Sequence, residues 1–446
     1  MFFTKYITLN LGTISEMIPI IPVRDFKPIN TTSPTLGDAT LSGLTNPPPL
    51  SLYIHIPWCV KKCPYCDFNS HDFRSKNDTE KLPEKRYVSA LISDLEQSVP
   101  QVYGRKIHSV FFGGGTPSLF SPDAIHSILN AVRMLTPLEY DAEVTLEANP
   151  STVESAHFEG YKSAGVNRIS LGIQSFNANH LRAIGRVHDD KQAVKAAELA
   201  LKTFDRVNLD LMYGLPNQSL AQAITDANRA IAFGSDHLSF YHLTLEPNTP
   251  FYRTPPNLPG DDLSADMQVS IEQLLATHGF DHYETSAFCK PSLLNKNAQA
   301  KHNLNYWQFG DYLGIGAGAH SKLSYHDKIT RETRHKHPNA YMQNALGNNS
   351  LDYNPQDHNS IANNAVDQMW VIEQKELVFE FMMNALRLNN GFDARLFQQR
   401  TGLRIDVMAL QLNTALKQGL ITHENNFIKP TELGKRYLNN LLELFL

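Results

Sequence analysis

The chain has few cysteines, no long apolar run and no excess of positive charge, and each shortage excludes a class of protein. Four cysteines among 446 residues are too few for the disulfide framework of a small secreted protein. No apolar stretch reaches the roughly 20 residues that a transmembrane helix needs, and the N-terminal segment lacks the continuous apolar core of a secretory signal. The formal net charge of -5 argues against a protein that binds nucleic acid through a basic surface.

Three of the four cysteines stand close together, directly after an apolar run. They are Cys59, Cys63 and Cys66, in a C-x3-C-x2-C pattern that follows Leu52–Ile56. An odd number of thiols cannot all pair as disulfides, and closely spaced thiolates are ligands of a soft metal centre. Three ligands leave one position of such a centre open for another molecule. Cys289 stands alone and is typical of a small buried hydrophobic residue.

A zinc site is the simpler interpretation of this motif, with His55 or His71 as the fourth ligand. Structural zinc sites usually combine two separate C-x2-C pairs, and no second pair follows in this sequence. The pattern therefore favours an iron–sulfur cluster in which one iron has no cysteine ligand.

Short apolar segments alternate with segments of helical spacing from Leu52 onward, which predicts parallel strands with helices packed outside them. The interpretation is an α/β fold, a closed or partly closed barrel. The expected strands are Leu52–Ile56, Ile107–Phe112, Glu143–Glu147, Arg168–Ile173, Val207–Leu211 and His237–Leu243, with a further strand at Phe280–Phe288. The expected helices are Arg86–Val99, Pro122–Leu135, Val153–Ala164, Asp190–Phe204, Leu220–Phe233 and Ser264–His278.

Glycine-rich or polar residues follow successive expected strands. Gly113–Thr116 follows the second, and Glu147, Gln174 and Asp210 stand at the ends of the next three. Because the carboxyl ends of parallel barrel strands meet on one face, these residues predict a single site there. We also expect the backbone N–H groups of Gly113–Thr116 to approach a ligand, since glycines carry no obstructing side chain.

The composition divides the chain into four segments. Residues 1–49 read as a poorly ordered, proline-containing leader, and 50–345 as the barrel with its C-terminal extension. Residues 346–370 form a polar junction, and in 371–446 a helix–hairpin–helix pattern predicts a small winged-helix-like α+β domain.

The motif C-x3-C-x2-C, with Tyr65 before its last cysteine, resembles the signature of the radical S-adenosylmethionine superfamily, and Gly-Gly-Gly-Thr-Pro at 113–117 strengthens the resemblance. It implies a partial (β/α)6 barrel and a [4Fe–4S] cluster on Cys59, Cys63 and Cys66 whose open iron takes S-adenosylmethionine. The ligand residues that it implies for this cofactor are Tyr53, Tyr65, Gly114, Gly115, Thr116, Glu147, Gln174, Arg186 and Asp210.

Within that superfamily the chain resembles the oxygen-independent coproporphyrinogen III oxidases, with one departure. Those enzymes carry a further cysteine two residues after the third, where this chain has Phe68. The stretch His302-Asn303-x-x-Tyr306-Trp307 is instead similar to the haem chaperone branch called HemW. This resemblance implies that His302, Asn303, Tyr306 and Trp307 contact haem. In a helix, His302 and Tyr306 would share one face.

We therefore expect a haem chaperone that passes haem to an acceptor haemoprotein, and we lean away from an enzyme. The alternative is an oxidase that decarboxylates coproporphyrinogen III. The expected partners are haem and the acceptor, either free or in a membrane, with no nucleic acid. A homodimer is left open, and the expected location is the cytoplasm.

Overall fold

The computed structural model describes residues 44, 46–73, 82–291, 298–347 and 364–446. Most of the leader predicted at 1–49 and most of the polar junction predicted at 346–370 lie outside these residues. The four predicted segment boundaries stay a prediction.

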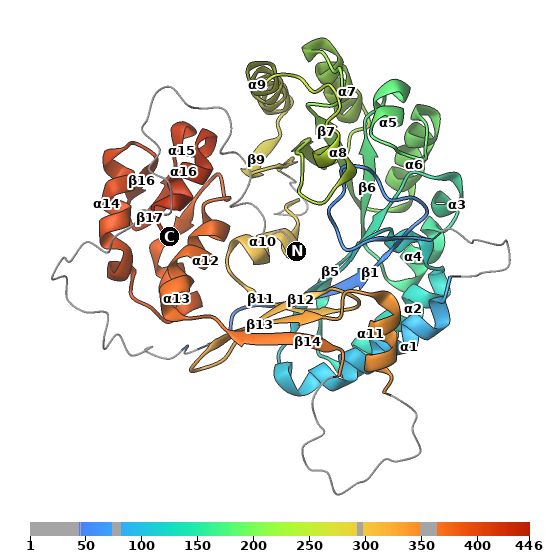
Figure 1. The fold of residues 1–446 in the computed structure, drawn as a ribbon, viewed down its shortest axis with the longest axis horizontal. Helices are drawn as coiled ribbons and strands as arrows, with labels where there is room; N and C mark the ends of the chain where they lie inside the picture. Colours follow the sequence, from blue (N-terminus) through green and yellow to red (C-terminus); the bar gives the residue numbers. More distant parts are fainter. Residues whose placement is uncertain (1–43, 45, 74–81, 292–297, 348–363) are drawn as a thin grey trace, which may run out of the picture.

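A twelve-stranded sheet forms the framework, in the order β14-β13-β12-β11-β1-β4-β5-β6-β7-β8-β10-β9. Its central strands, from β11 to β8, run parallel and curl into a partial barrel (Figure 1). These strands are β11 (Asp311–Ile315), β1 (Leu50–Ile56), β4 (Ile107–Gly114), β5 (Leu138–Ala148), β6 (Arg168–Gln174), β7 (Arg206–Tyr213) and β8 (His237–His242).

Helices follow the strands and cover the convex side of the sheet (Figure 1). Ser121 caps α2, while Asp189 and Ser219 form capping boxes at α6 and α7, so each of these helices begins where a side chain satisfies its first N–H groups. The helices are α1 (Glu84–Ser98), α2 (Pro122–Leu135), α4 (Phe158–Ala164), α6 (Asp190–Thr203), α7 (Leu220–Ala232) and α9 (Asp261–Thr277). The predicted α/β partial barrel is confirmed.

Alternation along the strands separates an apolar face from a polar one, because successive side chains point to opposite sides of a strand. In β6, Ile169 and Leu171 are fully buried under the outer helices, whereas Arg168 and Ser170 line a cavity inside the barrel. In β7, Asn208 and Asp210 also line that cavity. The strands β6 and β7 therefore turn polar side chains into the barrel interior.

Helix α10 (Lys301–Trp307) closes the end of the barrel at which the strands begin, and we call it the floor helix. Asn305 Nδ2 donates to Ser51 Oγ at 3.0 Å and to the Asp311 carbonyl at 2.7 Å. The backbone N–H of His302 donates to Glu143 Oε1 at 3.3 Å. Figure 1 shows α10 within the curve of the sheet. Polar groups from β1, β5 and β11 thus fix the floor helix in place.

Antiparallel strands extend both edges of the barrel. On one side β12 (His320–Ser324), β13 (Ile329–Arg334) and β14 (Val366–Val371) continue from β11. On the other side, the single strand predicted at Phe280–Phe288 is wrong. It is a hairpin of β9 (Asp281–Glu284) and β10 (Ala287–Cys289), because β10 pairs antiparallel with β8 and the chain must turn at Thr285 to pair again.

The C-terminal part has its own hydrophobic core, in which Phe381, Phe397 and Ile428 are fully buried. It lies beside the open side of the barrel (Figure 1). Its elements are α12 (Gln374–Ala385), β15 (Phe392–Asp393), α13 (Ala394–Thr401), α14 (Ala409–Lys417), β16 (Ile421–Glu424), β17 (Phe427–Pro430), α15 (Glu432–Arg436) and α16 (Leu438–Glu443). None of the helices in the described residues has the length and apolar character that a membrane crossing requires.

Candidate functional site

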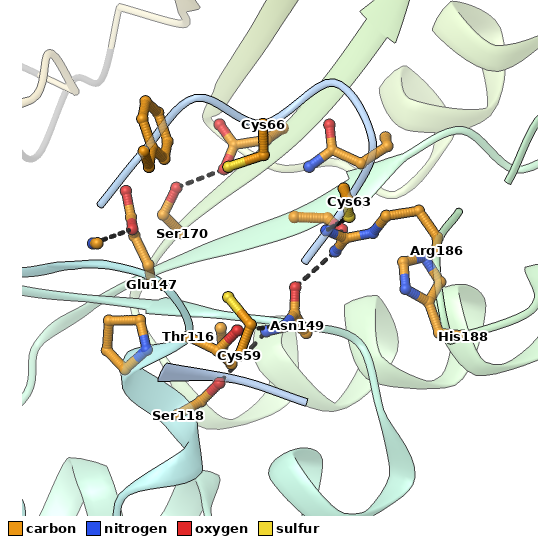
Figure 2. Close-up of a pocket in the computed structure, with 18 of the residues that line it drawn as sticks. Cys59, Cys63, Cys66, Thr116, Ser118, Glu147, Asn149, Ser170, Arg186 and His188 are labelled. Atoms are coloured by element: carbon orange, nitrogen blue, oxygen red, sulfur yellow. Dashed lines mark hydrogen bonds between the residues drawn. The ribbon is translucent and has the colours of Figure 1, made fainter. Parts of the chain in front are cut away.

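A cavity of about 680 Å³ runs through the barrel interior. Cys59, Cys63 and Cys66 line one end, which we call the mouth, and Figure 2 shows their side chains around one space. Arg168, the first residue of β6, and Asn303 of the floor helix also line the cavity, and we call their end the floor. One cavity therefore connects the carboxyl ends of the strands with the floor helix.

A short parallel pair of strands holds the cysteine loop. Strand β2 (Trp58–Cys59) pairs with β3 (His71–Asp72), which closes the loop that carries Cys63 and Cys66. The Phe251 N–H donates to the Pro64 carbonyl at 3.0 Å, so the segment after β8 covers the loop from outside. The three thiols consequently face the same cavity.

Burial is the main cause that shifts the thiol pKa values. It raises the pKa of Cys66 to about 11 and raises the pKa of Cys59 as well. With pKa values raised in this way these thiols keep their protons at neutral pH, whereas metal coordination deprotonates a thiol outright. The donor set therefore fits a cationic metal centre. In the described part of the chain, no three His, Cys, Asp or Glu side chains gather closely enough to hold a single metal ion. This does not test the predicted cluster, because each cysteine would bind a different iron.

In the alternative zinc site, His55 is not available as the fourth ligand. Nδ1 of His55 lies 2.9 Å from the Tyr53 hydroxyl, and Nε2 lies 2.8 Å from the Asn69 carbonyl oxygen, so both ring nitrogens are engaged. His71 packs against the ring of His337 at 5.5 Å. Its Nε2 is buried without a partner among the described residues.

Eight of the nine residues predicted to bind S-adenosylmethionine line the cavity: Tyr65, Gly114, Gly115, Thr116, Glu147, Gln174, Arg186 and Asp210. Tyr53 is not one of the lining residues. Its ring instead stacks on Phe111 at 6.3 Å, and its hydroxyl contacts His55. Tyr53 thus supports the wall of the cavity from behind.

The glycine segment serves close packing, which corrects our expectation of free backbone donors. The N–H groups of Gly115 and Thr116 donate to the carbonyl oxygens of Ile56 and Trp58, each at 2.8 Å. The Gly114 N–H donates to Glu147 Oε2 at 3.2 Å. A Cβ atom on Gly115 would lie 2.6 Å from the Trp58 oxygen. Glycine is therefore required because strand β4 presses against the start of the cysteine loop.

Two carboxyl groups stand at neighbouring strand ends within the cavity. Burial, followed by the charge of Asp210, raises the pKa of Glu147 to about 8. Burial also raises the pKa of Asp210, whose oxygens accept hydrogen bonds from Ser170 Oγ at 2.8 Å and Asn208 Nδ2 at 2.7 Å. Both groups can accept hydrogen bonds from an ammonium group or a hydroxyl group of a ligand.

Arg186 joins the cysteine loop to the strand ends. Its Nη1 lies 3.8 Å from the Cys63 sulfur, and its Nη2 donates to Asn149 Oδ1 at 2.5 Å and to the Gly172 carbonyl at 2.8 Å. Its Nε is buried with no partner among the described residues. An unpaired buried donor of this kind is costly, and an anionic ligand group at the mouth would satisfy it.

Sequence reasoning missed the polar groups that support Arg186. Asn149 Nδ2 donates to Thr116 Oγ1 at 3.0 Å, and the Asn149 N–H donates to Glu154 Oε2 at 3.0 Å. Ser118 also donates to Glu154, and Figure 2 shows Asn149 between Thr116 and Arg186. Asn149 could have been predicted as a site residue, because it directly follows strand β5. Glu154 could not, because it lies beyond the strand end.

The four residues predicted to contact haem do not share one accessible surface. His302 is only 2% exposed, and its ring stacks on Phe111 at 4.7 Å. Of the four, only Asn303 lines the cavity. Tyr306 packs against Tyr312 at 4.5 Å, and Trp307 lies under the Arg387 guanidinium. Haem contact by these residues stays a prediction, and for His302 it requires the floor helix to move.

Comparisons with known proteins place two regions of the chain. Residues 53–230 match the model of the radical SAM superfamily. Residues 372–437 match the model of the HemN C-terminal domain.

Two similar relatives match the chain over nearly all of their own length. "Heme chaperone HemW" of Escherichia coli is 46% identical over 90% of this chain and 98% of that protein. "Heme chaperone HemW" of Haemophilus influenzae is 45% identical over 90% and 98%. Among solved structures, the coproporphyrinogen III oxidase (HemN) of Escherichia coli aligns with a TM-score of 0.71 at 22% identity, over 91% of this chain and 92% of that one. That likeness concerns the fold.

Proposed function

The chain belongs to the HemW family within the radical SAM superfamily, and from this premise we propose that it is a haem chaperone, which binds haem and passes it to an acceptor haemoprotein. The observation that carries the proposal is the near full-length similarity to relatives named for that activity. Phe68 supports it, because it stands where the oxidases have a further cysteine.

We propose that Cys59, Cys63 and Cys66 hold a [4Fe–4S] cluster and that the strand ends beside them hold S-adenosylmethionine. Such a cluster supplies one electron and an iron with a free coordination position. In this proposal Glu147 accepts hydrogen bonds from the ammonium group and Arg186 binds the carboxylate. Asp210 accepts from the ribose hydroxyls, while Gly114, Gly115, Thr116, Tyr65, Gln174 and Tyr53 shape the surrounding wall.

The buried, unpartnered Nε of Arg186 supports a carboxylate at the mouth. The pKa of Glu147, about 8, has a related consequence. A ligand ammonium group beside this carboxyl group would compensate for its burial and favour the ionised form. A ligand with adjacent amine and carboxylate groups therefore matches the buried carboxyl group of Glu147 and the unpartnered Nε of Arg186.

One experiment separates the chaperone from the oxidase. The full-length protein is reconstituted anaerobically with iron and sulfide, and haem is titrated while the Soret absorbance is followed. We expect saturable haem binding, and haem transfer when an apo-haemoprotein such as apomyoglobin is added. In parallel, the protein is incubated with S-adenosylmethionine, a reductant and coproporphyrinogen III. Formation of protoporphyrinogen IX, or absence of saturable haem binding, would overturn the proposal.

His302 is tested in the same titration. If haem ligation involves this residue, His302→Ala changes the Soret maximum and weakens haem binding. An unchanged spectrum and affinity would leave His302 as a packing residue of the floor helix, in keeping with its stacking on Phe111.

A further inference from the structure

The floor of the cavity contains a buried arginine that makes few hydrogen bonds and no direct ion pair with the described residues. Arg168 is 3% exposed and lines the cavity. Within the described residues, its side chain makes one long hydrogen bond, from Nη1 to Thr145 Oγ1 at 3.5 Å, and no carboxylate lies within ion-pair distance of it. A guanidinium group has five N–H donors. Burying such a group with few partners is costly, so a hydrogen-bond acceptor inside the cavity would stabilise it.

The charge of Arg168 acts on the two carboxyl groups higher in the cavity and lowers the pKa of both, against the effect of burial, but neither carboxyl group forms an ion pair with it. Ser170 and Asn208 bind the oxygens of Asp210, and the Gly114 N–H donates to Glu147 Oε2. Ser170 pairs with Glu147 across the sheet, and Arg168 precedes Ser170 by two residues in β6. At roughly 3.3 Å per residue, Arg168 lies about 7 Å closer to the floor.

Asn303 of the floor helix lines the same cavity as Arg168, and its side chain makes no hydrogen bond to the described residues. Arg168 also lies near the floor helix. Burial is the main cause that lowers the pKa of the neighbouring His302, and the charges of His108 and Arg168 add to the effect. The floor of the cavity thus presents the guanidinium group of Arg168 and the carboxamide of Asn303. Both have hydrogen-bonding capacity that the described residues leave unused.

We propose that Arg168 and Asn303 form a second ligand site, at the floor of the cavity, that binds a carboxylate group. A planar guanidinium can donate two parallel hydrogen bonds to a carboxylate, and the Asn303 amide can donate a further one. The carboxylate belongs to either a free small organic acid or a propionate side chain of haem. Only the second source rests on the proposed function.

The first arm of the test uses a free acid. Binding of propionate, and of its neutral analogue propionamide, to the reconstituted full-length protein is measured by saturation-transfer NMR. We expect propionate to bind more tightly than propionamide. Arg168→Gln should weaken propionate binding by about ten- to a hundredfold, the range for charge-assisted hydrogen bonds. Arg229→Gln, on the outer helix α7, is the matched control and should change nothing.

The second arm uses haem and haem dimethyl ester, which differ only in their propionate charges. If haem supplies the carboxylate, the wild type prefers haem and Arg168→Gln removes that preference. If only propionate binding depends on Arg168, the ligand is a free acid. Haem binding by the wild type itself tests the proposed function, so the two proposals fail separately.

Two measurements guard against misfolding of the arginine variant. Cluster absorbance and the thermal unfolding midpoint identify a damaged protein. Asn303→Leu, which removes no hydrogen bond to a described residue, should weaken carboxylate binding by about threefold or more and decides the matter if Arg168→Gln does not fold. The proposal is overturned if neither carboxylate is preferred over its neutral analogue, or if the preference persists in folded variants of both residues.

Discussion

At the mouth of the cavity the polar side chains come from loops that follow strands, whereas at the floor they come from strand interiors and from helix α10. The mouth contains the thiols, where burial raises the pKa of Cys59 and Cys66, and Arg186, whose Nε is buried with no partner among the described residues. Most floor groups already have partners, as with Asn305, Ser51 and Asp311. The difference supports the proposal that the mouth receives a cofactor. The floor is mainly structural, and its exceptions are Arg168, Asn303 and the Nε2 of His302, which is buried with no partner among the described residues.

The largest expected effect is loss of the iron–sulfur cluster proposed at the mouth. Cys63→Ser removes one of the three proposed cluster ligands, so we expect the reconstituted protein to lose its iron–sulfur absorbance almost completely. Cys289→Ala is the matched control, because Cys289 is buried in a separate small cluster near β10 and should leave the absorbance intact. Full iron stoichiometry in Cys63→Ser would mean that the cluster has other ligands.

A smaller effect, on the free energy of unfolding, distinguishes the two asparagines of the floor helix. Asn305→Ala leaves the Asp311 carbonyl and Ser51 Oγ without their donor, and we expect the free energy of unfolding to fall by about 2–4 kcal/mol. Asn303→Ala, two residues earlier in the same helix, should change it by less than about 0.5 kcal/mol. Urea denaturation measures both. Equal losses would contradict a floor in which only one of the two is structural.

A third effect depends on pH and concerns Glu147. Burial raises its pKa from the ordinary glutamate value of 4.5 to about 8 in the folded protein. Between these values the unfolded chain releases the proton while the folded protein retains it, so this residue lowers stability progressively as the pH rises from about 4.5 to 8. In Glu147→Gln this contribution disappears. We expect the stability difference between variant and wild type to grow in favour of the variant across that range, as measured by thermal unfolding midpoints. A difference that is independent of pH would show that the carboxyl group ionises normally.

The strands and outer helices could be predicted because their signals are local. Ile169, Leu171 and their equivalents mark the outer face of each strand, and residues such as Ser121 and Ser219 mark where helices begin. The hairpin of β9 and β10 could not be predicted in this way. Its turn depends on pairing with β8, which is distant in the sequence.

The mouth was predictable for a related reason. Cysteine spacing and the residues directly after strands are visible in the sequence, and parallel strands necessarily bring those positions to one face. The support of Arg186 by Asn149 and Glu154 was less visible, because it depends on side chains meeting across loops. The free donors expected at Gly113–Thr116 were wrong, since glycine is equally suited to ligand approach and to backbone packing.

The sequence by itself determined the thiol-rich set of side chains at the mouth, the strand–helix repeat and the family, because these depend on residue type and spacing. Only the tertiary structure decided the roles of the floor residues. His302 and Asn303 are neighbours in the sequence, yet one is enclosed against Phe111 and the other lines the cavity. The physical reason is that a helix turns successive side chains to different sides, and only the strands packed around it decide which side is buried.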